Sequence, residues 1–128
     1  MNIKKEVDRI SDDEKNSIAI DFDGVIHRNS KGFHDGTIYD DAIEGSYESL
    51  EKISKTYRII LFTCKANPNR PQIDGRTGVE LVEEWLEKHD MLKFVDKVVC
   101  GKPNAKFYID DKGIRFINWK DTLKEINV

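Results

Sequence analysis

The chain has 128 residues, of which 38% are hydrophobic and 35% are charged, a composition typical of one globular domain rather than of a disordered chain. Its 21 basic and 24 acidic side chains give a net charge of −3. We therefore do not expect a general nucleic-acid or membrane-surface binder, since either would need a basic patch. No apolar run is long enough to span a bilayer, so no membrane partner is expected.

Residues 1–16 are a polar and charged lead-in, with a short helix expected over Lys4–Ile10. They lack the apolar core and the small-residue cleavage site of a signal peptide, so we expect a cytoplasmic protein. The two cysteines, Cys64 and Cys100, do not make a disulfide framework, and neither belongs to a CxxC pair. We expect both to be small buried hydrophobes.

The first part of the domain is expected to hold one buried strand and one helix. The short apolar run 17–22 predicts a strand inside a parallel sheet. The polar residues 27–39, which include glycines, predict a loop or small hairpin. Apolar residues at helical spacing predict a helix over 41–56, with Asp40 or Asp41 as its cap.

The same alternation of strands and helices continues to the end of the chain. It implies an α/β fold, a three-layer α/β/α Rossmann-like sandwich around a mainly parallel sheet. Trp85 and Trp119 stand at helical spacings and are expected in the core. The further expected elements are a strand over 57–62, a Pro/Gly-rich loop over 65–77, a helix over 77–89, strands over 98–100 and 107–109, a small edge strand over 115–117, and a helix over 119–126 capped by Asn118.

Polar residues follow each of the four main strands. Ligands of such sheets bind outside the carboxyl ends of the strands. Taken singly, each polar group has an ordinary explanation as a turn, a structural threonine or a solvated lysine. Two neighbouring acid clusters would repel each other without a cation, so together they predict a hard, oxygen-bound metal such as magnesium, with phosphate held by the lysine and threonine. The residues at the four strand ends are Asp21 with Asp23, Thr63, Lys102, and Asp110 with Asp111.

In this order the motifs DFDGV, LFT, GKP and YIDD resemble the four motifs of the haloacid dehalogenase superfamily. The resemblance covers about residues 17–117, and the ordered set is more specific than any one motif. It implies a Rossmann-like core, a magnesium ion and phosphoryl transfer through an aspartyl-phosphate. The implied substrate of this magnesium-dependent phosphatase is a phosphomonoester, expected to be a small metabolite such as a sugar phosphate or nucleotide.

The resemblance also implies a role for each motif residue. Asp21 would be the nucleophile and Asp23 the general acid/base, while Thr63 and Lys102 would bind the transferring phosphoryl group. Lys106 competes with Lys102, but Lys102 directly follows its strand. The implied magnesium ligands are Asp21, Asp110, the backbone carbonyl of Asp23, and Asp111 as a further ligand or as support for the others.

These roles agree with the chemistry of the residues. A carboxylate that attacks an anionic phosphate needs its charge offset, which magnesium and Lys102 would do. An acid two residues further on lies on the same side of an extended segment and can transfer protons. An acid at Asp23, rather than threonine or serine, favours hydrolysis over a stable phosphoenzyme by the family pattern.

The interval from Asp21 to Thr63 leaves no room for a large cap domain, so a capless member of the superfamily is expected. Its flap would be residues 27–39, and residues 65–77 would form a substrate-side loop. A homo-oligomer could cover the open site. Candidate anion-binding groups around the mouth are Arg70, Arg76, Arg28, His27, Lys31, His34 and Lys65.

Three other functions compete with this interpretation. A response-regulator receiver would carry nothing acidic after the lysine, whereas Asp110 and Asp111 follow Lys102 here. A cysteine phosphatase would match Cys64 and Arg70 as Cys-x5-Arg, but Pro68 removes one N–H from the phosphate cradle. A non-catalytic or vestigial binding protein would keep the motifs with little turnover.

Overall fold

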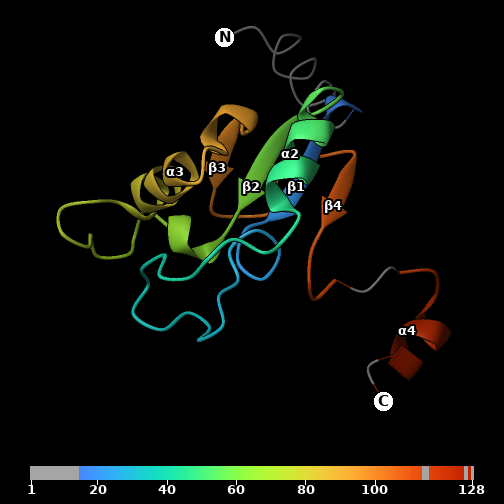
Figure 1. Cartoon of the computed structure of the whole chain (residues 1–128). Coiled ribbons are helices and arrows are strands. Elements are labelled where there is room, and N and C mark those ends of the chain that lie inside the picture. The colour runs from blue at the N-terminus through green and yellow to red at the C-terminus, as the bar shows by residue number, and fades with distance from the viewer. Residues whose placement is uncertain (1–14, 114–115, 126, 128) are drawn as a thin grey trace, which may run out of the picture.

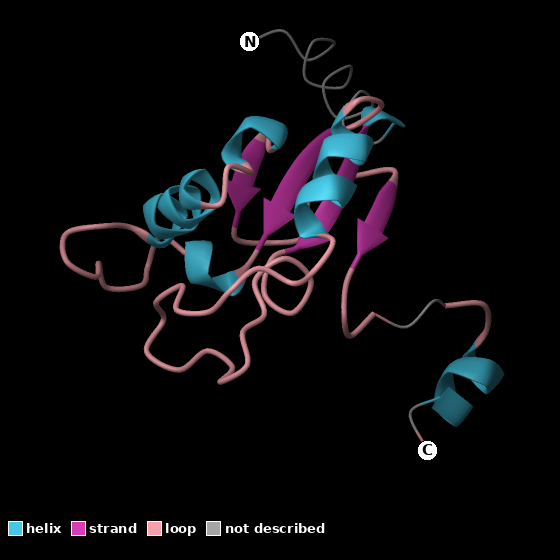
Figure 2. Cartoon of the chain, viewed as in Figure 1, coloured by secondary structure: helices cyan, strands magenta, loops and turns pink. Residues whose placement is uncertain are grey.

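The computed structural model describes residues 15–113, 116–125 and 127, and they form an α/β fold. Four parallel strands lie in the order β3-β2-β1-β4, as Figure 1 and Figure 2 show. The expected α/β class with a parallel sheet is confirmed. The elements are β1 (Ser17–Asp21), α2 (Ser46–Ser54), β2 (Arg58–Phe62), the 3-10 turn η1 (Cys64–Ala66), α3 (Gly78–Lys88), the 3-10 turn η2 (Leu92–Phe94), β3 (Lys97–Val99), β4 (Phe107–Ile109) and α4 (Trp119–Glu125).

The two central strands, β1 and β2, are apolar along nearly their whole length because both of their faces are covered. They pair from Ser17 opposite Arg58 to Asp21 opposite Phe62. β4 pairs with β1 on the other side. Because all the strands are parallel, their carboxyl ends meet at one edge of the sheet, and the residues that follow them are brought together there.

Both crossover helices pack on one face of the sheet. α2 contributes the fully buried Leu50, and α3 contributes Val82, Trp85 and Leu86. These side chains meet alternate residues of the strands, as the two-residue period of a strand requires. The buried residues of this main core are Ile18, Ile20, Phe22, Ile26, Leu50, Ile59, Leu61, Val82, Trp85, Leu86 and Met91.

The opposite face of the sheet has a smaller core. Ala19 and Phe62 lie there with Ala105, which belongs to the connection from β3 to β4. That connection, residues 100–106, contains no helix. The described residues therefore show a sheet with helices on one face, and the third layer of the expected sandwich is not among them.

The C-terminal helix α4 lies apart from the sheet in Figure 1, and none of its residues is buried. Trp119 is 68% exposed, so its expected place in the core was wrong, whereas Trp85 is buried as expected. The expected cap is confirmed, because Oδ1 of Asn118 accepts the backbone N–H of Asp121 at 2.9 Å. Helical spacing alone did not distinguish the two tryptophans, because both occur on amphipathic segments.

The helix expected over 41–56 begins later, at Ser46. Ala42 forms an antiparallel bridge with His27, and the N–H of Ile43 donates to the carbonyl of Ile26 at 2.8 Å. Gly45, with a left-handed φ of 89°, precedes the helix in place of an aspartate cap. These backbone bonds hold residues 41–43 extended and fasten the end of the flap to its beginning.

Some expectations concern residues that the structure does not describe. The helix over Lys4–Ile10 lies outside the described residues, as does residue 115 of the expected edge strand; residues 116 and 117 are described and are not in a strand. Among the described residues, no helix combines the length and apolar character needed to cross a membrane.

Trp85 ties the main core to the flap, because its indole N–H donates to the carbonyl of Asp40 at 2.9 Å. Trp85→Phe should lower the free energy of unfolding by about 1–3 kcal/mol, since it leaves that carbonyl without its donor. Urea unfolding measures the change. The control is Trp119→Phe, which should change stability by less than about 0.5 kcal/mol; similar losses in both variants would contradict this account.

Candidate functional site

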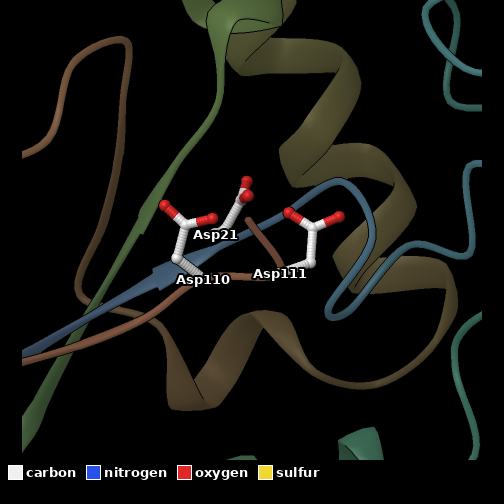
Figure 3. A group of neighbouring side chains, drawn as sticks. All are labelled: Asp21, Asp110 and Asp111. Atoms are coloured by element: carbon white, nitrogen blue, oxygen red, sulfur yellow. The ribbon is translucent and has the colours of Figure 1, made fainter. Parts of the chain in front are cut away.

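Three carboxylates converge at the carboxyl edge of the sheet. Asp21 ends β1, and Asp110 and Asp111 directly follow β4. Because Ile20 pairs with Ile109, the next residues of the two strands are brought side by side. One carboxylate oxygen from each acid lies within 4.8 Å of the others, and Figure 3 shows the three groups directed into the same space. An all-oxygen donor set of this kind suits a hard divalent cation.

Gly24 allows Asp111 to reach this cluster. Its φ of +89° is left-handed, and a Cβ at this position would overlap Oδ2 of Asp111. Glycine is the residue that adopts such a conformation without steric cost. Gly24 of the DFDGV motif therefore permits both the turn after β1 and the close approach of Asp111, which follows β4.

Burial and the neighbouring acids raise the pKa of Asp21 to about 7. Burial is the largest cause, followed by the charge of Asp110 and a hydrogen bond with Asp111. Each effect disfavours a further negative charge at this point. Without a cation, Asp21 therefore holds a proton up to near neutral pH, and a bound cation would offset the negative charge of the neighbouring acids.

Asp23, two residues further along, is in the opposite electrostatic environment. Its Oδ1 accepts from Nδ1 of His27 at 2.8 Å and from Nζ of Lys65 at 3.0 Å, and its Oδ2 accepts from the hydroxyl of Thr63 at 2.8 Å. Burial alone would raise the pKa of Asp23, but the three hydrogen bonds outweigh burial and lower it. The side chain is thus kept ionised and is not one of the three converging carboxylates.

His27 was expected at the mouth of the site, but it is fully buried beneath Asp23. Its Nε2 accepts the backbone N–H of Asp40 at 3.0 Å, so Nδ1 carries the proton that is donated to Asp23. The ring packs against Phe22, Tyr39 and Trp85. It is therefore a support for Asp23 and not a group that can meet an incoming anion.

The two candidate lysines lie at opposite edges of the sheet. Nζ of Lys102 is 3.4 Å from Oδ2 of Asp110. A hydrogen bond from the backbone N–H of Lys112, with the charge of Lys102, lowers the pKa of Asp110. Lys106 stands before β4, where its N–H donates to the carbonyl of Ser17 at 2.8 Å. The geometry thus brings Lys102, and not Lys106, to the acids.

A cavity of about 300 Å³ opens over this edge. Asp21 and Asp111 lie in its wall, and the flap contributes Asn29, Gly32 and Phe33. Sequence reasoning did not single out Asn29, Phe33 or Lys112 as site residues; their only sequence signal is a position in the flap or directly after the YIDD motif. The lining residues are Asp21, Asp23, Asn29, Gly32, Phe33, Thr63, Cys64, Lys65, Asp111 and Lys112.

The three candidate arginines do not line this cavity. Arg76 pairs with Glu84, and Arg28 is exposed on the flap. Arg70 donates to the carbonyl of Lys65 at 2.9 Å, and its guanidinium stacks on Phe33 at 4.5 Å from the ring centroid. Arg70 thus connects the substrate-side loop to the flap in place of an open anion site.

Both cysteines are exposed, so the expectation of buried cysteines was wrong. Cys64 begins the turn η1, where the chain leaves the sheet, and Cys100 lies just beyond β3. The loop from Cys64 to Arg70 does not form a phosphate cradle. Within it, the backbone N–H groups of Lys65, Ala66, Asn67, Asn69 and Arg70 donate to oxygens of residues 63–67, and the cradle of a cysteine phosphatase would need them free.

No protein-family model, curated protein or solved structure matches this chain. The function is therefore argued from the motifs and from the geometry of the site.

The raised pKa of Asp21 makes cation binding depend on pH. A proton and a divalent cation compete for this carboxylate, so Mg²⁺ affinity should rise about tenfold between pH 6 and pH 8 as a group with a pKa of about 7 ionises. Calorimetry at the two pH values measures this.

The raised pKa of Asp21 also makes the free energy of unfolding depend on pH. The folded metal-free chain keeps a proton on Asp21 up to about pH 7, whereas the unfolded chain releases it near 3.8. The contribution of Asp21 to the free energy of unfolding therefore falls as pH rises through this window. Asp21→Asn should remove that contribution and much of the pH dependence of Mg²⁺ binding; an unchanged pH dependence would contradict the assignment.

Proposed function

We propose that the chain is a magnesium-dependent phosphomonoester hydrolase that acts through an aspartyl-phosphate on Asp21. The observation that carries the proposal is the convergence of three carboxylates, two of which, Asp21 and Asp111, line a cavity large enough for a small phosphate ester. The four ordered motifs that resemble the haloacid dehalogenase superfamily give further support. The proposal includes a capless, three-layer form of that fold, with residues 27–39 as the flap.

In the first step, a carboxylate oxygen of Asp21 attacks phosphorus and the bond from phosphorus to the leaving oxygen breaks. The leaving oxygen takes a proton from the carboxyl group of Asp23 and departs as an alcohol, which leaves Asp23 ionised. Magnesium, when bound by Asp21, Asp110 and Asp111, would supply the positive charge that lets an anionic phosphate approach three acids. Lys102, which already contacts Asp110, adds charge on the same side of the site.

In the second step, water attacks the phosphorus of the aspartyl-phosphate, releasing phosphate and restoring the Asp21 carboxylate. Asp23 is suited to accept the proton of that water, because the donors around it keep it ionised. The same donors oppose its protonation in the first step. A leaving group of low pKa, which needs little protonation, should therefore be processed best.

The substrate is a small phosphorylated metabolite, such as a sugar phosphate or a nucleotide. Phe33 presents an apolar ring to the cavity and is 47% exposed, so it offers a surface for the leaving group. Thr63 is a less direct ligand for the phosphoryl group, because its hydroxyl proton is donated to Asp23.

The proposal is tested first by Asp21→Asn. This variant should lose at least about a hundredfold in turnover of a nitrophenyl phosphate, because an amide is a poor nucleophile and a weaker magnesium ligand. The wild type should require Mg²⁺, stop in excess chelator and work poorly with Ca²⁺, whose looser coordination allows a carboxylate to bind through both oxygens.

The matched control is Asp74→Asn, an exposed acid in the substrate-side loop, which should retain wild-type turnover. Circular dichroism shows that each variant is folded. Turnover by Asp21→Asn above about a tenth of wild type, or undiminished activity in chelator, would refute the proposal. A wild type with no magnesium-dependent turnover would favour the non-catalytic alternative.

Asp23→Asn tests proton transfer. For an alkyl phosphate, kcat/KM should fall by about a hundredfold or more, whereas for a nitrophenyl phosphate it should fall by less than about tenfold, since nitrophenolate leaves without a proton. Water attack should slow for both substrates, so acid-stable trapping should reveal more phosphoenzyme than in wild type. Equal losses for both leaving groups would contradict the proton-transfer role of Asp23.

A further inference from the structure

Lys65 is a buried cation inside the candidate site. The whole residue is only 1% exposed, although it follows the end of β2 by three positions in a loop expected to be open. Its Nζ donates to Oδ1 of Asp23 at 3.0 Å and to Oδ1 of Asn29 at 3.2 Å. A lysine is rarely buried to this extent unless it is paired, and here the pair is formed with a residue of the first motif.

The ammonium group of Lys65 has donor capacity left for a ligand. A lysine carries three N–H donors, and the described residues provide oxygen acceptors for two of them. The ring of Tyr39 covers the group at 5.7 Å from its centroid. Lys65 also lines the cavity together with Asp21 and Asp111. An oxygen of a phosphoryl group held over Asp21 would therefore be an acceptor for the third N–H of Lys65.

Lys102 and Lys65 occupy different parts of the site. The side chain of Lys102 is 49% exposed and lies beside Asp110, so its ammonium group pairs mainly with a candidate metal ligand. Lys65 stands on the side of Asp23 and is shielded from water, where a charge-assisted hydrogen bond is stronger than at the surface. A phosphoryl group on Asp21 would have the two cations on different sides.

We propose that Lys65 is a second phosphate-binding residue, held in place by Asp23 and by Asn29 of the flap. The inference rests on the proposed function and adds a ligand to it. Asp23 and Asn29 fix the ammonium before substrate arrives, so little reorganisation is needed when phosphate binds. Through Asn29, the position of the flap is also coupled to the cation that meets the phosphoryl group.

A simpler role for Lys65 would be to neutralise the buried Asp23 carboxylate. Lys65→Met alone does not separate the two roles, because it leaves a buried charge without its partner and can unfold the chain. The comparison of Asp23→Asn with the double variant Asp23→Asn/Lys65→Met does separate them. Neither variant contains the buried carboxylate that Lys65 would neutralise, an amide at position 23 can still accept a hydrogen bond from the ammonium group, and the two variants differ only at position 65.

The probe is inorganic phosphate in saturating Mg²⁺, with affinity measured by calorimetry and folding by circular dichroism. Asp23→Asn should bind phosphate at least as tightly as wild type, because a nearby negative charge has been removed. The double variant should bind it about ten- to a hundredfold more weakly, as expected for the loss of one charge-assisted hydrogen bond. The control is Lys52→Gln, an exposed lysine of α2, which should leave phosphate affinity unchanged.

Equal phosphate affinity in Asp23→Asn and the double variant would overturn the assignment of Lys65 while leaving the proposed function intact. A wild type that neither binds phosphate in Mg²⁺ nor hydrolyses a phosphomonoester would overturn both. An equal loss in Lys52→Gln would show that only the general positive charge of the chain matters, and would also refute a specific role for Lys65.

Discussion

The repulsion among Asp21, Asp110 and Asp111 is the constraint on which the candidate site depends. The parallel pairing of β1 with β4 makes it unavoidable, because residues that follow paired strand ends must lie next to each other. Hydrophobic burial along β1 fixes that register, so the backbones of these residues cannot separate without shifting a buried strand. The fold thus holds a cluster of negative charge that a cation would relieve, and this charge adds to burial in raising the pKa of Asp21.

The surroundings of Asp21 and Asp23, two aspartates of one short motif, shift their pKa values in opposite directions. Asp21 faces other acids and has a raised pKa, while Asp23 faces His27, Thr63 and Lys65 and has a lowered one. Separation of this kind is how neighbouring carboxyl groups come to have distinct roles in catalysis. It arises because the strand ends at Asp21, so Asp23 lies in the turn and points beneath the flap rather than along the sheet edge.

The sequence predicted the parts of the molecule that repeat a simple pattern. Apolar runs predict β1, β2 and β4, and the rule for parallel sheets predicts that Asp21, Asp110 and Lys102 lie at one edge. These predictions succeeded because strand burial and strand direction are local or topological properties. The roles of the same residues in catalysis remain predictions.

The errors have a common physical origin in tertiary contacts between distant segments. Ile43 fits a helical period but is held extended by Ile26, and Trp119 fits an amphipathic face that meets no core. Their positions in polar loops predict open charges for Lys65 and His27, although both are buried against Asp23. Their one sequence signal was spacing, since Lys65 lies two residues after Thr63 and His27 four residues after Asp23.

The flap and the substrate-side loop behave as one structural unit, and this bears on how a substrate would be selected. Arg70 reaches from the loop to stack on Phe33, and a Cβ at Gly36 would overlap its guanidinium. Arg70 also binds the carbonyl of Lys65, whose side chain holds Asn29. A leaving group that displaced Phe33 would therefore disturb the contacts around Lys65 as well. In the proposed enzyme, selection of the leaving group and positioning of the phosphoryl group would be coupled through a few side chains, a means of discrimination that open loop charges would not provide.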